Sequence, residues 1–164
     1  MIRAITTIGE PILRRRATEA NLDRLRRGLY ADLINDLVET MRDAQGVGLA
    51  APQIGQSVRI CVLEVAGNPR YPDFAPFPLT VLVNPTLTVT DQQRSIVEEG
   101  CLSISGIRNR IARPRSVRVT AFTSKSSPLE QEWSGTPAVI VQHEVDHLDG
   151  ILITDHATAL AEDA

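Results

Sequence analysis

Apolar residues recur at helical spacing in two parts of the chain. From Leu25 onward a set of apolar side chains falls on one face of a helix, with charged residues on the opposite face. Gly46 is a typical stop signal, so we expect one helix that starts near Leu25 and ends before Gly46. A second apolar run predicts a helix from Thr136 to about Leu148, with Thr136 as its cap and Gly150 after its end.

Segments rich in β-branched residues lie between these two helices. They predict strands at Val58–Val65, Leu79–Asn84, Leu87–Thr90, Val117–Phe122 and Leu129–Trp133. Residues 1–23 resemble an arm with a turn at Glu10-Pro11, and prolines mark an irregular loop between 69 and 78. Helices and strands do not alternate, so we predict an α+β fold. Antiparallel or mixed sheets would pack around the C-terminal helix, with one further helix near the N-terminus. Residues 1–164 are expected to form one domain.

Composition narrows the possible functions. The chain has 164 residues, of which 43% are hydrophobic and 23% charged, as in an ordinary globular protein. Its formal charge of -3 disfavours direct nucleic-acid binding. No apolar run approaches the roughly 18 residues of a membrane span, and the N-terminal segment does not resemble a signal peptide. Two cysteines do not make a disulfide framework, so we expect reduced thiols and a cytoplasmic location.

Residues 142–147, with the sequence QHEVDH, carry the strongest chemical signal. His143 and His147 are spaced i and i+4, so both imidazoles lie on one helix face and can bind one metal ion. Glu144 lies beside them and is the candidate base that takes a proton from a metal-bound water. A helix with two surface histidines and an acidic neighbour is the alternative for this motif taken alone.

A catalytic metal site of this type needs a third protein ligand. The extended protease motif would place a histidine at Ile153, and His156 is more typical of an exposed terminal residue. We therefore expect an upstream thiolate. Cys61 lies in an apolar strand segment and is typical of a core residue, whereas Cys101 lies at a polar strand end or turn. Glu99 is a candidate acceptor for the second N–H of a ligand imidazole, with a solvated carboxylate as the alternative.

A small, apolar segment with the sequence GVGLAAPQIG occupies residues 46–55. Small residues allow a backbone to approach a ligand closely. Gln53 is the only side chain in this segment with hydrogen-bond donors and an acceptor, so it is a candidate to polarise a carbonyl. The alternative is a tight loop that packs the first helix onto the sheet. The segment lacks the ending of a phosphate-binding loop.

Three motifs occur along the chain in the following order: GVGLAAPQIG at 46–55, EGCLS at 99–103 and QHEVDH at 142–147. This set closely resembles the peptide deformylase family, whose motifs are G-x-G-x-A-A-x-Q, E-G-C-x-S and Q-H-E-x-D-H. Members of that family remove the N-formyl group from the initiating methionine of nascent proteins. The resemblance spans about Ile5 to Thr154.

The resemblance implies a metal centre and a base. Cys101, His143 and His147 would hold one divalent metal ion, expected to be Fe(II) in the cell, with zinc, nickel or cobalt able to replace it. A metal-bound hydroxide would attack the formyl carbon. Glu144 would act first as the general base and then as the acid that protonates the departing amine.

The resemblance also implies how the substrate is held. Gln53 and the backbone N–H of Leu102 would stabilise the oxyanion formed from the formyl carbonyl. The Gly48 backbone would line the substrate channel. The methionine side chain would occupy a pocket formed by Val47, Val139, Ile140 and the ring of His143.

The implied partners are N-formylmethionyl peptides and the ribosome near its exit tunnel, without a membrane or nucleic acid. Fourteen residues follow Gly150, so the long C-terminal docking helix of some family members is not expected. Ser105 stands where the family often has proline, a change that removes no catalytic group. A basic cluster would hold a peptide backbone or an acidic partner, with solvated strand edges as the alternative; its members are Arg108, Arg110, Arg113, Arg115 and Arg118.

Two other classes of function stay open from the sequence. The first is a different metallohydrolase, such as a small peptidase, against which the absence of a third ligand after the histidine helix argues. The second is a metal-holding or partner-binding protein without catalysis. Glu144 and Gln53 argue against it, because neither residue is needed merely to hold a metal.

Overall fold

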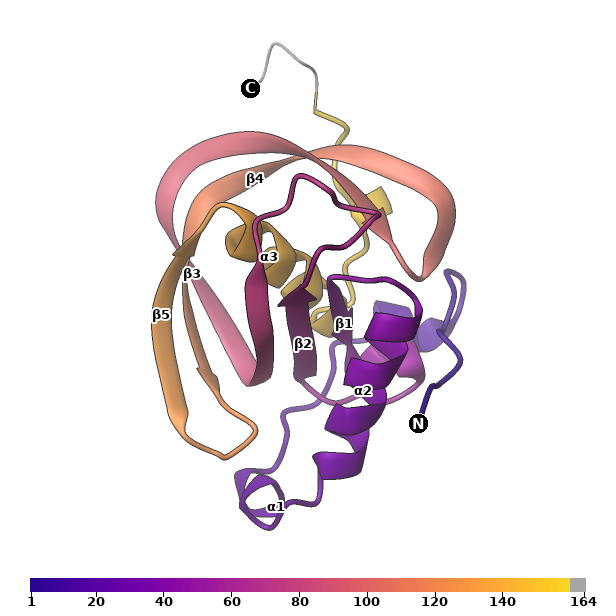
Figure 1. Ribbon diagram of the computed structural model, residues 1–164, viewed down its shortest axis with the longest axis vertical. Helices are drawn as coiled ribbons and strands as arrows, with labels where there is room; N and C mark the ends of the chain where they lie inside the picture. The colour runs from indigo at the N-terminus through magenta and orange to yellow at the C-terminus, as the bar shows by residue number, and fades with distance from the viewer. Residues whose placement is uncertain (160–164) are drawn as a thin grey trace.

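The computed structural model describes residues 1–159. The helices are α1 (Leu22–Arg26), α2 (Ala31–Asp43) and α3 (Thr136–Leu148), with short 3₁₀ helices at η1 (Pro11–Arg14), η2 (Ala51–Ile54) and η3 (Ile153–Asp155). The strands are β1 (Gly48–Ala50), β2 (Ile60–Val65), β3 (Phe77–Cys101), β4 (Ile104–Phe122) and β5 (Pro128–Ser134). The α+β prediction is confirmed (Figure 1).

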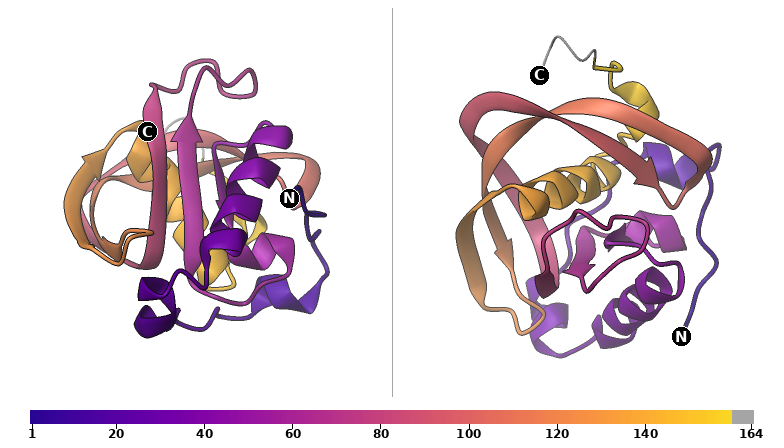
Figure 2. Two further views of the ribbon diagram at one scale, coloured as in Figure 1. Left: turned by 60° about the horizontal axis from the view of Figure 1, so that its bottom comes forward. Right: turned by 45° about the horizontal axis from the view of Figure 1, so that its top comes forward.

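The five strands form one sheet in the order β1-β2-β3-β4-β5, and every neighbouring pair is antiparallel. Within residues 1–159, the only parallel pairing is an isolated bridge between Thr18 and Val58. The longest strands, β3 and β4, pair from Val83–Phe122 to Cys101–Ile104. Both curve into an arch over α3 (Figures 1 and 2). The sheet therefore wraps around the C-terminal helix, as the sequence predicts.

The arch depends on bulges that the sequence pattern conceals. The predicted strands Leu79–Asn84 and Leu87–Thr90 are parts of one strand, β3, so their separation is wrong. A register shift between Val83 and Thr86 bends the strand there, and Asn84 takes a positive φ of 52°. The shifted segment contains Pro85, which has no backbone N–H to donate to the ladder and is therefore tolerated at a bulge. The sequence pattern does not predict strands in residues 91–116, which form the arch, because many of these residues are polar or charged and resemble a loop.

The predicted first helix is two helices rather than one. Gly28 takes a φ of 72° between α1 and α2, a left-handed conformation that ends α1 and turns the chain. Leu29 is consequently exposed, although its spacing would fit the apolar face of a continuous helix. The helix Thr136–Leu148 is confirmed, but its N-cap residue is Gly135 and not Thr136. Of the fourteen residues after Gly150, residues 160–164 lie outside the described part of the chain.

The central strands are covered on both faces by apolar side chains. On one face α3 packs through Val141 and Leu148 into a cluster that includes Cys61. On the other face α2 packs through Leu37 and Met41 against the sheet. Burying each such Leu or Met side chain typically contributes about 1.5–3 kcal/mol. The short strand β1, which the sequence analysis did not predict, contacts both α2 and α3. Its backbone is thus fixed directly against the histidine helix.

Candidate metal centre and substrate pocket

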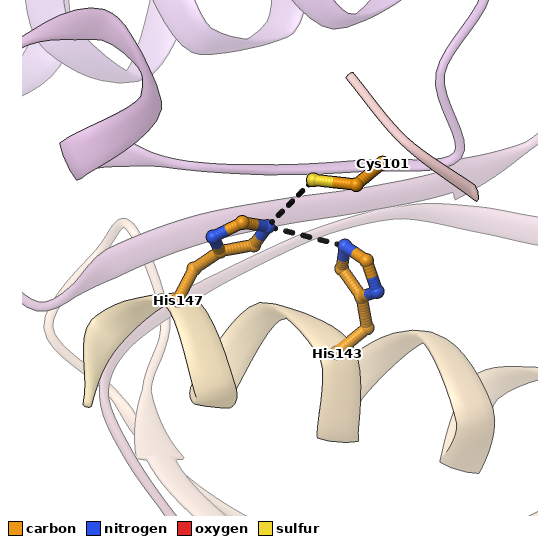
Figure 3. A group of neighbouring side chains, drawn as sticks. All are labelled: Cys101, His143 and His147. Carbon is orange, nitrogen blue, oxygen red and sulfur yellow. Dashed lines mark hydrogen bonds between the residues drawn. The ribbon is translucent and has the colours of Figure 1, made fainter. Parts of the chain in front are cut away.

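Two elements bring three potential metal ligands together. Cys101 is the last residue of β3, at a tight turn in which it pairs with Ile104 of β4. His143 and His147 project from one face of α3 towards this turn (Figure 3). The Cys101 Sγ lies 3.3 Å from His147 Nε2, and the two histidine Nε2 atoms are 3.1 Å apart. All three ligand atoms lie within 4.8 Å of one another.

This donor set fits a divalent metal ion. Ligands around a tetrahedral zinc-type ion, at ~2.1 Å for nitrogen and ~2.3 Å for sulfur, stand about 3.4–3.6 Å apart. The observed separations are close to that spacing. Burial lowers the pKa of His147, which favours the neutral imidazole that a metal requires. The other cysteine, Cys61, is fully buried in the apolar core, and burial raises the pKa of its thiol.

Glu144 faces the same space as the ligands but has no polar partner of its own. Its side chain is 3% exposed, and within residues 1–159 its Oε2 atom accepts no hydrogen bond. Burial raises the pKa of Glu144 to about 7. Gly48 leaves room for the carboxylate, because a Cβ atom there would clash with Glu144 Oε1. A buried carboxyl without a partner next to three ligand atoms is suited to exchange a proton with water or substrate.

Glu99 contacts one of the potential ligands and is itself held by an arginine. Its Oε1 lies 3.0 Å from His143 Nδ1, and Arg113 donates two hydrogen bonds to its carboxylate, at 2.8 and 2.9 Å. Burial alone would raise the pKa of Glu99, but the hydrogen bonds from Arg113 and His143 outweigh it and hold the pKa at about 2. The interpretation as a solvated carboxylate is therefore wrong for Glu99. Within the described chain, Nδ1 of His147 has no such acceptor.

Two basic side chains, for which the sequence suggests exposed positions, instead make contacts with acidic residues. Arg113 is 4% exposed, so a solvated strand edge is the wrong interpretation for this member of the basic cluster. Besides Glu99 it binds Asp146, with a hydrogen bond of 2.7 Å. His156 also contacts Asp146, through Nε2 at 2.8 Å, and is not part of the ligand cluster. Both side chains thus hold α3 through Asp146.

Gln53 lies in η2 and is directed towards the cysteine ligand. Its Oε1 accepts a hydrogen bond of 3.0 Å from the backbone N–H of Ala50, which fixes the amide orientation. Its Nε2 donates to Ser103 Oγ at 3.1 Å and lies 3.9 Å from the Cys101 sulfur. Leu102 follows Cys101 in the turn. An amide N–H and a turn backbone therefore lie beside the ligand cluster.

One pocket contains every site residue predicted from the sequence except His147, which lies beneath it and is 1% exposed. Its base carries the potential ligands and Glu144, and its walls are mainly apolar. The predicted residues that line it are Val47, Gly48, Gln53, Cys101, Leu102, Val139, Ile140, His143 and Glu144.

Three further lining residues come from the loop between β2 and β3, which the sequence analysis treats only as irregular. Arg70, Tyr71 and Phe74 line the pocket, and the rings of Tyr71 and Phe74 stack with centroids 4.7 Å apart. A signal was present in the sequence, because this short loop holds one of two tyrosines and one of three phenylalanines. Aromatic residues are enriched where ligands bind.

The fold and pocket define a class first: an α+β protein with a potential Cys-His-His metal site at the base of a largely apolar pocket. None of the helices in the described part of the chain is long and apolar enough to span a membrane. The family follows from comparison with known sequences. The model of the polypeptide deformylase family matches residues 2–163, and the chain belongs to this family.

Individual relatives agree with the family model. The chain is 44% identical to peptide deformylase 3 of Streptomyces avermitilis, over 93% of this chain and 70% of that protein. It is 36% identical to a peptide deformylase of Brucella suis, over 99% of this chain and 88% of the relative. The resemblance stated from the three motifs is confirmed, and the chain is an enzyme of this family.

Solved structures match the fold equally well. A class I type b peptide deformylase of Acinetobacter baumannii, crystallised with Met-Ala-Ser bound, aligns with a TM-score of 0.92 at 35% identity. The alignment covers 96% of this chain and 99% of that one. The peptide deformylase of Thermotoga maritima aligns with a TM-score of 0.85 at 33% identity, over 97% and 99% of the two chains.

Proposed function

We propose that this enzyme hydrolyses the formamide bond of N-formylmethionyl polypeptides, releasing formate and a free amino terminus. One observation carries the proposal: a cluster of three potential ligand atoms and a partnerless buried carboxyl lie together at the base of a single, mainly apolar pocket. Cys101, His143 and His147 would hold the metal ion, Fe(II) in the cell, with zinc, nickel or cobalt as substitutes. A bound divalent ion supplies Lewis acidity, which makes water nucleophilic at neutral pH.

Glu144 performs the proton transfers in this proposal. Its carboxylate accepts a proton from the attacking water as the oxygen–carbon bond forms, and delivers it to the amine nitrogen as the carbon–nitrogen bond breaks. The raised pKa of about 7 supports this assignment, because a group that both accepts and donates a proton works best near the ambient pH. The small Gly48 keeps the carboxylate in place without a clash.

Gln53 and the turn after Cys101 stabilise the charge that develops on the formyl oxygen. The Gln53 Nε2 and the backbone N–H of Leu102 are the proposed donors, and the hydrogen bond from Ala50 N to Gln53 Oε1 keeps that amide from flipping. One such donor contributes about 2.7–4 kcal/mol to transition-state stabilisation. Since both donors are fixed before substrate arrives, little reorganisation is needed during the reaction.

The apolar walls of the pocket suit the methionine side chain. Val47, Val139, Ile140 and the ring of His143 are the proposed contacts, and Phe74 adds an aromatic surface. A thioether packs favourably against apolar and aromatic groups. Placing the side chain there would direct the formyl group towards the base of the pocket.

The proposed setting is the cytoplasm, with nascent chains near the ribosomal exit as substrates and residues 1–164 acting as one catalytic domain. Both cysteines are free. Cys101 must stay reduced to serve as a ligand, so a reducing compartment is a requirement of the proposed chemistry.

The test is formate release from formyl-Met-Ala by protein that has been purified anaerobically and loaded with a known amount of metal. We expect turnover that depends on metal content. Met-Ala-Ser without a formyl group is the matched control, and it should remain intact. Cleavage of the unformylated peptide alone would indicate a peptidase, and full metal content without formate release would contradict the proposed function.

A further inference from the structure

Two guanidinium groups lie against one aromatic ring at the rim of the pocket: Arg70 and Tyr71 line the pocket, and Arg108 contacts them from outside its lining. Arg70 and Tyr71 come from the loop between β2 and β3, and Arg108 comes from β4. The Cζ atoms of Arg108 and Arg70 lie 5.0 and 5.9 Å from the Tyr71 ring centroid. Arg108 also donates a hydrogen bond of 3.0 Å to the carbonyl oxygen of Arg70. Two distant segments are thereby tied into one cationic rim.

The positive charge of this rim is incompletely neutralised. Arg108 is paired with Glu98, but at 3.5 Å and with both side chains exposed, an arrangement that contributes little. Arg70 forms no ion pair with any carboxylate in residues 1–159, although it is half-buried and lines the pocket. A half-buried cation without a counter-ion at the mouth of a substrate pocket favours an anionic group in the ligand.

The rim also lies at the right depth to meet a polypeptide beyond its first residue. Arg70 Nη2 is 3.7 Å from the position that a Cβ atom would take on Gly100, the residue before the cysteine ligand. An extended chain advances about 3.3–3.6 Å per residue. With the formyl group at the ligand cluster and the first side chain in the apolar pocket, the residues that follow would leave the pocket past Gly100, next to the rim.

We propose that Arg70 and Arg108 make this enzyme select polypeptides with an acidic side chain at the second or third position. The inference rests on the proposed function, which fixes the direction of the bound chain. Guanidinium groups bind carboxylates through paired, charge-assisted hydrogen bonds. The Tyr71 ring holds both arginines in place before binding, so less side-chain entropy is lost.

The test compares acidic peptides with their isosteric amides. The probes are C-terminally amidated Met-Glu-Ala and Met-Gln-Ala, and Met-Ala-Glu and Met-Ala-Gln, titrated into the zinc-loaded enzyme by NMR. Amidated ends leave the side chain as the only carboxylate. We expect the acidic member of at least one pair to bind about fivefold more tightly. The preference should shrink as salt is raised, because exposed charges are screened.

Variants assign the effect to the rim. Arg70→Gln should remove most of the preference, Arg70→Lys should retain part of it, and the double variant with Arg108→Gln should abolish it. Arg118→Gln is the matched control, since Arg118 is an exposed arginine of β4 that pairs with Glu130, whereas Arg108 lies against the Tyr71 ring. It should leave the preference unchanged.

Equal dissociation constants within both pairs would overturn the inference, as would a preference that survives the double variant. The formylated forms of the same peptides are assayed for formate release in parallel. Turnover with equal binding within the pairs would sustain the proposed function and reject the charge selection. A binding preference without turnover of any formylated peptide would do the reverse.

Discussion

At the base of the pocket Glu99 is held by two hydrogen bonds from Arg113 behind it, and each of the two side chains is 4% exposed. At the rim, Arg70 and the exposed Arg108 lie against an aromatic ring instead. The base is assembled from β3, β4 and α3, which the core holds rigidly. The rim depends on a loop and one exposed side chain. Changes at the base should therefore alter chemistry by orders of magnitude, and changes at the rim should alter substrate preference by small factors.

The largest expected effect comes from removing one of the proposed ligands at the base. Cys101→Ala should abolish tight metal binding and with it formate release, because two imidazoles alone leave the proposed centre incomplete. The measurement is elemental analysis together with turnover of formyl-Met-Ala. Cys61→Ala is the control, since Cys61 lies in the core and should affect only stability. Full metal content in Cys101→Ala would remove the proposed ligand set.

The next effect is expected at Gln53, the proposed oxyanion donor. Gln53→Ala should retain the metal and lower kcat by roughly 10²–10³, with little change in KM, because the lost hydrogen bond strengthens mainly in the transition state. Steady-state kinetics on metal-checked samples decide this. Gln56→Ala, an exposed glutamine two residues beyond η2, should behave as the unmodified enzyme. A raised KM with unchanged kcat would instead assign Gln53 to ground-state binding.

A smaller loss of metal affinity is expected at Glu99, which contacts His143 Nδ1. Glu99→Gln leaves Arg113 with a single carboxylate partner and weakens the acceptor for His143 Nδ1. We expect metal affinity to fall about 10–100-fold and unfolding free energy to fall by about 3 kcal/mol. Chelator competition and denaturant titration measure the two effects. Glu98→Gln, an exposed neighbour, is the control, and wild-type metal affinity in Glu99→Gln would refute the orienting role.

The smallest effect is expected at the rim. Tyr71→Leu removes the ring that holds both guanidinium groups but keeps apolar bulk. The preference for acidic peptides should fall about two- to fivefold, in line with the strength of cation–π contacts, and any loss of kcat for formyl-Met-Ala should be far smaller than that expected for Gln53→Ala. Peptide titrations and kinetics on one preparation provide both numbers. A collapse of kcat would show that the rim is part of the reaction machinery and would erase the contrast with the base.

The sequence predicts the parts of this molecule whose chemistry is local. The helix Thr136–Leu148 with its i, i+4 histidines could be identified because one element carries the whole signal. Cys101 could be separated from Cys61 because a strand end and an apolar strand centre differ in composition. The family motifs then supplied roles for Gln53 and Leu102 that periodicity alone does not contain.

The features that the sequence does not predict depend on contacts between residues far apart along the chain. Arg113 is one of several arginines on an alternating strand, and only the arch of β3 and β4 places it between Glu99 and Asp146. Tyr71 acquires its position from Arg108, which lies far along the chain on β4. The division between α1 and α2 likewise rests on the conformation of Gly28. Spacing rules describe neighbours on one element, so they cannot indicate such pairings.

The central claim is that the base of the pocket performs metal-assisted hydrolysis with Glu144 as the proton carrier. The most direct measurement is formate release from formyl-Met-Ala by Glu144→Gln, with metal content determined on the same sample. Because Glu144 is not one of the clustered ligand residues, we predict full metal occupancy and a loss of nearly all kcat. Wild-type turnover in fully metal-loaded Glu144→Gln would contradict the account.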